Sequence, residues 1–148
     1  MMHGLLLFAH LAGVVVWIGG MFFAAVCLHP SLAALAGKDR VGLMTGTLGR
    51  FLNYVIVAIV LIWASGIAMI AAAGASGMPI GWHLMIGIGF VMTLIFAYLL
   101  IVLFRPARSA VAQGDLAAVP ALFGRIRALV LVNLVLGAAA IASVTMLT

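Results

Sequence analysis

The sequence predicts an all-α integral membrane protein with four transmembrane helices in a single domain over residues 1–148. Two features of composition point there: 68% of the residues are hydrophobic and only 6% are charged. The third observation is four uncharged apolar stretches, each near or above the ~20 residues that a helix needs to cross the hydrocarbon core. Membrane barrel strands are shorter and alternate in polarity, so a barrel is excluded.

The four expected spans are residues 4–28, 51–73, 79–104 and 128–147. The first span is expected to stay in the protein, because it is too long for a signal-peptide core and no basic residue precedes it. The connection over residues 105–127 is expected to form a short amphipathic helix at the membrane surface.

The charges predict the orientation of the chain. The seven basic residues all lie in or beside the first and third connections: Lys38, Arg40, Arg50, Arg105, Arg108, Arg125 and Arg127. By the positive-inside rule these connections are cytoplasmic and both termini are outside, as in a multi-pass protein of a bacterial-type inner membrane. The net charge of +5 then reflects topology and anionic lipid heads, and no nucleic-acid partner is expected.

The two halves of the chain resemble each other, which predicts two parallel helical-hairpin repeats over about residues 4–73 and 79–147. "HLAGVVVWIGGMFFA" aligns with "HLMIGIGFVMTLIFA", so that His10 matches His83. Further along, the pairs Pro30 and Pro106, Asp39 and Asp115, and the two Gly-Arg dipeptides recur at offsets of 75 or 76 residues. Repeats with two spans each insert the same way and are related by an axis along the membrane normal.

The repeat places His10 and His83 at equivalent positions in the outer half of the bilayer. Ionisable residues in membrane spans usually face the bundle interior and mark function, and two facing imidazoles can hold one haem iron from both sides. On these faces Gly13 and Gly87 would make room for the porphyrin, and Trp17 and Phe90 would pack on it. Without a Cys-x-x-Cys-His motif the haem would be non-covalent haem b.

Several alternatives stay open at this point. Either histidine could bond a carbonyl at the membrane interface, which suits His83 at the start of its helix beside Trp82. The two glycines could serve helix packing, and the two aromatic residues could face the core or the lipid. Met85 lies about 200° from His83 around the helix, so His10 with Met85 is an alternative pair of axial ligands.

Copper is the alternative to haem. Thioether and imidazole groups suit Cu(I), and five such residues are expected near the outer surface: Met1, His3, Met78, His83 and Met85. Cys27 is the only cysteine, which excludes an intramolecular disulfide and a multi-cysteine metal site. The two carboxylates, Asp39 and Asp115, lie in connections, so no intramembrane acid is available for a proton path.

Nearly the whole chain resembles the CopD copper-resistance domain, through "HLAGVVVWIGGMFFA", the "GWH" that opens the third span and the "GR" before the fourth. The HemJ-type protoporphyrinogen oxidases are a related group of four-helix, haem b-binding proteins. There a helix 1 histidine, matched by His10, and a helix 3 lysine are implicated in function and haem ligation. Met85 replaces that lysine, which argues against protoporphyrinogen oxidation.

The leading hypothesis is therefore a haem b-binding membrane protein of CopD/HemJ type, acting in electron transfer or as a haem-dependent oxidoreductase. Its expected partners are the lipid bilayer, a quinone or external redox partner, and a second copy of the chain. The alternatives are a copper-handling membrane protein without haem, for uptake or resistance, and a packing subunit of a larger complex.

Overall fold

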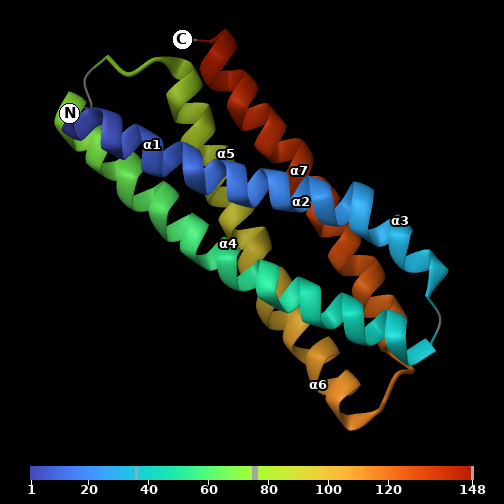
Figure 1. Cartoon of the computed structure of the whole chain (residues 1–148). Coiled ribbons are helices and arrows are strands. Elements are labelled where there is room, and N and C mark those ends of the chain that lie inside the picture. Colours follow the sequence, from blue (N-terminus) through green and yellow to red (C-terminus); the bar gives the residue numbers. More distant parts are fainter. Residues whose placement is uncertain (36, 75–76, 148) are drawn as a thin grey trace.

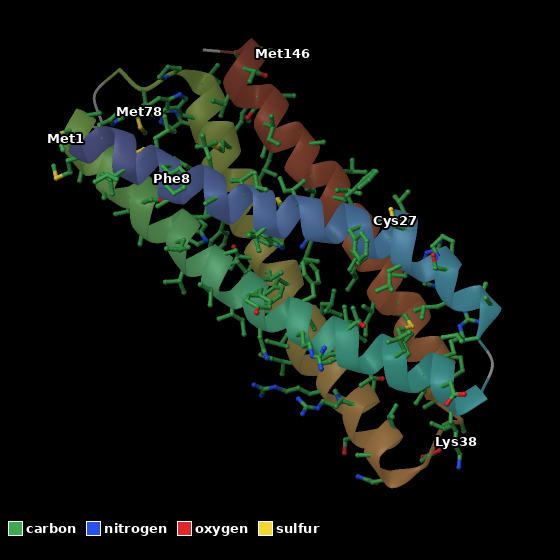
Figure 2. All side chains as sticks on the ribbon, viewed as in Figure 1. Met1, Phe8, Cys27, Lys38, Met78 and Met146 are labelled. Carbon is green, nitrogen blue, oxygen red and sulfur yellow. The ribbon has the colours of Figure 1, made fainter. Side chains whose placement is uncertain are left out.

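The computed structural model describes residues 1–35, 37–74 and 77–147, and within these ranges the chain is helical without any strand. Four rods are long and apolar enough to cross a membrane: Met2–Ala34, Gly37–Ala73, Ile80–Gln113 and Val119–Met146. The expected four-helix membrane architecture is confirmed. The N- and C-terminal ends lie at one end of the bundle, opposite the end that carries Lys38 (Figures 1 and 2).

The rods extend beyond the expected spans into the basic connections. The second rod is one helix, α4 (Gly37–Ala73), of 37 residues, which corresponds to a length of ~56 Å. This exceeds the ~30 Å hydrocarbon core of a bilayer, so the charged first turns of α4 project beyond it. Likewise α6 (Arg105–Gln113) continues the third rod without a break, whereas the sequence predicted a short amphipathic helix at the membrane surface over residues 105–127.

The first and third rods alternate between α-helical and π-helical segments, and the first rod ends in a 3₁₀ segment. The first rod consists of α1 (Met2–Val14), η1 (Val15–Gly19), α2 (Gly20–Phe22), η2 (Phe23–Leu28), α3 (His29–Ser31) and η3 (Leu32–Ala34). The third consists of α5 (Ile80–Tyr98), η4 (Leu99–Phe104) and α6, and the fourth is α7 (Val119–Met146).

Two of the π-helical segments have an evident cause in the sequence. η2 ends two residues before Pro30, and η4 ends two residues before Pro106. A proline within a helix lacks the N–H for the ladder, and its ring collides with the carbonyl four residues earlier, so the helix widens there. The first residues of the two segments are 76 positions apart in the sequence, and so are their last residues. The two prolines are separated by the same offset. The duplication stays a prediction, and this correspondence supports it.

The helices pack mainly as two antiparallel pairs, α1 with α4 and α5 with α7 (Figure 1). Glycines permit the close approach within each pair. A Cβ at Gly13 would lie 2.9 Å from the carbonyl oxygen of Ala58 in α4, and one at Gly81 would collide with the carbonyl of Ser143 in α7. Small residues at helix contacts are the usual means of close packing in a bilayer, where the hydrophobic effect does not drive association.

The two pairs meet in a core displaced toward the basic end of the bundle. There the buried side chains include Leu48, Leu52, Val55, Leu99, Leu103, Phe104, Val119, Phe123 and Ile126. Nearer the termini the pairs are joined by a hydrogen bond and an aromatic contact. Trp63 Nε1 donates to Thr93 Oγ1 at 3.1 Å, and Trp17 packs edge-on against Phe96 with ring centroids 6.3 Å apart. The looser packing of this half leaves a cavity.

Candidate functional site

A cavity of about 560 Å³ lies between the two helix pairs, in the half of the bundle nearer the termini. Its volume falls within the ~300–1,000 Å³ typical of small-molecule sites. All four rods contribute to its walls, which are almost entirely aliphatic and aromatic. Its chemically distinctive residues are His3, His10, Trp17, Trp63, Met69, Trp82, Met85, Met92 and Thr145.

His10 is the only half-buried histidine on the cavity wall, and α4 holds its ring in place. Its Nδ1 lies 3.1 Å from the carbonyl oxygen of Ile62 and 3.2 Å from Oγ of Ser65. A carbonyl oxygen can only accept, so the neutral ring carries its proton on Nδ1 and donates it to Ile62. Nε2 is then left with a free lone pair, the arrangement found in metal-ligating histidines.

Ser65 and Gly66 complete the surroundings of this ring. The Ser65 hydroxyl donates to the carbonyl of Leu61, which leaves its oxygen lone pairs for the Nδ1–H of His10. A Cβ at Gly66 would lie 3.4 Å from Cε1 of His10, so the glycine leaves the imidazole just enough space. The ring is thus oriented by backbone and hydroxyl groups of α4 before any ligand binds.

Three tryptophans form much of the remaining wall. Trp17, in η1, is 4% exposed and is fixed by its edge-on contact with Phe96. Trp63 is fixed by its hydrogen bond to Thr93, and Trp82 lies in the first turn of α5. These rings give the cavity rigid aromatic faces suited to a flat apolar ligand.

The cavity also brings thioether sulfurs to the same space as His10. Met85 and Met92 come from α5, and Met69 comes from α4. Within the described residues, no three His, Cys, Asp or Glu side chains are grouped as ligands for a metal ion. The donors available in this cavity are therefore imidazole nitrogen and thioether sulfur, which bind soft metals and haem iron.

His83 does not line the cavity. Its side chain is exposed, and its Nδ1–H donates to the carbonyl oxygen of Pro79 at 3.2 Å, in the first turn of its own helix. A hydrogen bond from His83 to a backbone carbonyl was the alternative to iron ligation that the sequence allowed. The structure accordingly places His10 with Met85 in one cavity and leaves His83 outside it.

The four residues predicted to contact a porphyrin divide in the same way. Trp17 lines the cavity. Gly13 is buried against α4 and serves helix packing, whereas a Cβ at Gly87 would meet nothing within 4 Å. Phe90 is 55% exposed on the outer surface of the bundle. Of the predicted faces, only His10 and Trp17 of the first rod reach the cavity, because α5 is rotated so that Met85, Gly89 and Met92 face inward.

Several residues of the cavity were not predicted from the sequence. Trp63, Met69 and Met92 look like ordinary members of apolar spans. Ser65 could have been predicted as a neighbour of His10, because it is a polar residue within the second span. It lies eight residues before the end of α4, and His10 lies eight residues after the start of α1. In an antiparallel pair these two positions lie at the same depth.

The chain was compared with known protein families, with characterised proteins and with solved structures, and none of them matches it.

Proposed function

We propose that this protein binds one haem b in the cavity between the helix pairs and acts in electron transfer in the membrane. The observation that carries the proposal is the state of His10. Its Nδ1–H is engaged by Ile62, and its Nε2 is the free nitrogen of a ring on the wall of a cavity of about 560 Å³. An apolar site with one oriented imidazole is how helical bundles hold haem.

Met85 is the better candidate for the second axial ligand. It lines the same cavity as His10 but comes from the other helix pair, whereas His83 is exposed and bonded to Pro79. A thioether in place of a second imidazole raises the reduction potential of haem iron. Bound haem would supply one-electron transfer between ferrous and ferric states, and Trp17 would keep water from one of its faces.

The polar edge of a porphyrin also has a place in this arrangement. The lining residues include no Lys or Arg, and Arg50 and Arg125 lie toward the other end of the bundle. His3, exposed at the start of α1, and Thr145, near the end of α7, line the cavity on the side of the termini. The propionates of a bound haem would lie on this side, where water could solvate them and a quinone or an external donor could approach.

Copper handling without haem is a second candidate, favoured by one specific observation. Three thioethers and two imidazoles line the same cavity, from Met69, Met85, Met92, His3 and His10. This donor set suits Cu(I). In that function the cavity would pass or store a single soft ion, and the tryptophan faces would have no evident purpose. Haem is therefore preferred.

The deciding experiment is the visible spectrum of the purified full chain with haem and copper analysis. We expect a reduced b-type α band, about one haem per chain and loss of this haem in His10→Ala. His29→Ala is the matched control, because His29 lies at the opposite end of the same rod. Near-stoichiometric copper without a Soret band would establish the second candidate, and unchanged haem content in His10→Ala would overturn the proposed site.

A further inference from the structure

A second, smaller hollow lies at the basic end of the bundle, between the end of the first rod and the start of α7. This groove of about 40 Å³ is lined by Ala24, Ala25, Leu28, His29, Leu32, Met44, Leu48, Ile126, Arg127 and Val130. Its floor is aliphatic, and its only ionisable lining residues are His29 and Arg127. Arg40 also lies close enough for its charge to act on the His29 ring.

The corresponding place in the other half of the chain is filled. At the loop offset of 76 residues, Phe104 takes the position of Leu28 and is 3% exposed. A Cβ at Gly49 would lie 3.3 Å from Cζ of Phe104, whereas a Cβ at Gly124, the partner of Gly49 in the Gly-Arg repeat, would meet nothing within 4 Å. The groove thus remains open because Leu28 is smaller than Phe104, which fills the corresponding place in the other half.

The shape and charge of the groove define its occupant. A narrow groove of about 40 Å³ with an aliphatic floor suits part of an acyl chain. The groove also lies at the end of the bundle where all seven basic residues gather, the end that meets the anionic leaflet under the positive-inside rule. Basic pockets between membrane helices on this side suit phosphate head groups.

We propose that this groove binds one anionic phospholipid, with an acyl chain along the aliphatic floor and the phosphate between Arg127 and His29. Arg127 supplies a fixed charge with a fork of N–H donors suited to phosphate oxygens. Arg40 adds a second positive charge on the same side. The lipid would fasten the end of the first rod to the start of α7, beside the core in which the two helix pairs meet.

The test is a titration of the purified full chain in neutral detergent with phosphatidylglycerol or phosphatidylcholine, with bound lipid counted by native mass spectrometry. We expect one phosphatidylglycerol per chain to be bound in preference to phosphatidylcholine. Arg127→Gln should weaken this binding about fivefold, the factor for one basic residue at an anionic lipid surface. Arg125→Gln is the matched control, because Arg125 is exposed on the same helix but does not line the groove.

A second pair of variants tests the groove without changing charge. Leu28→Phe copies the residue that closes the other half and should abolish the single tight lipid, and Ala24→Leu should do the same from a neighbouring position. Circular dichroism and gel filtration identify the variant that folds. Three outcomes would each overturn the proposal. They are equal loss of lipid binding in Arg125→Gln and Arg127→Gln, retention of the lipid in a folded groove-filling variant, and displacement of the lipid by inorganic phosphate.

Discussion

The Nδ1 nitrogen of His10 lies 3.1 Å from the carbonyl oxygen of Ile62 on the adjacent helix. Because that oxygen can only accept, the contact assigns the proton to Nδ1 and the free lone pair to Nε2. A backbone carbonyl cannot be removed by a point mutation, so Ser65, the second partner of the same nitrogen at 3.2 Å, is the accessible probe of this contact.

Ser65→Ala is expected to retain haem but to hold it less tightly. The Ile62 carbonyl still orients the ring, whereas the lost hydroxyl removes one outer partner of the ligand, and such losses usually cost about 10–100-fold in metal affinity. We expect the low end of that range, measured as the rate of haem transfer to an excess of apomyoglobin. Complete loss of haem, as in His10→Ala, would contradict Ile62 as the main acceptor.

The variants Met85→Leu and His83→Ala distinguish the two possible ligand pairs. Leucine preserves the volume of Met85 but removes its sulfur, so the low-spin spectrum should become high-spin and the reduction potential should fall. His83→Ala should leave both unchanged, since that side chain is exposed and outside the cavity. The reverse pattern would restore the bis-histidine site expected from the repeat.

Gly13→Ala should destabilise the first helix pair. The added Cβ would lie 2.8 Å from Cγ1 of Ile62 and 2.9 Å from the carbonyl oxygen of Ala58, and the latter is backbone that cannot swing aside. Overpacking of this kind costs about 1–3 kcal/mol, which a thermal unfolding midpoint in detergent detects. Gly19→Ala is the control on the same rod, where a Cβ meets nothing within 4 Å. Equal midpoints in the two variants would contradict the packing role of Gly13.

Reporter fusions test the orientation of the bundle. The seven basic residues lie in or beside two connections at one end, so a fusion after Thr148 should report an outside location and one after Lys38 a cytoplasmic location. Alkaline phosphatase and a fluorescent protein that matures only in the cytoplasm give opposite readouts. A cytoplasmic signal at Thr148 would reject both the orientation and the outer placement of the cavity.

Much of the architecture followed from the sequence by itself. Four apolar stretches determined four spans, because a bilayer leaves the backbone no alternative to the helix over such lengths. The prolines at 30 and 106 were expected only as matching positions of the two halves, and the structure added that a π-helical segment precedes each of them. His10 was identified as a candidate ligand because an ionisable group is costly in lipid and rarely stands there without a purpose.

Only the tertiary structure decided which side chains share the cavity with His10. The sequence repeat gave His83 the same position along its helix, but position along a helix does not fix the rotation of that helix about its axis. The contact of Gly81 with Ser143 sets how α5 packs on α7. In this packing, Met85 and Met92 of α5 face the cavity, whereas His83 and Phe90 face away from it. Contacts between helices are made by residues distant in sequence, and no pattern along one span specifies them.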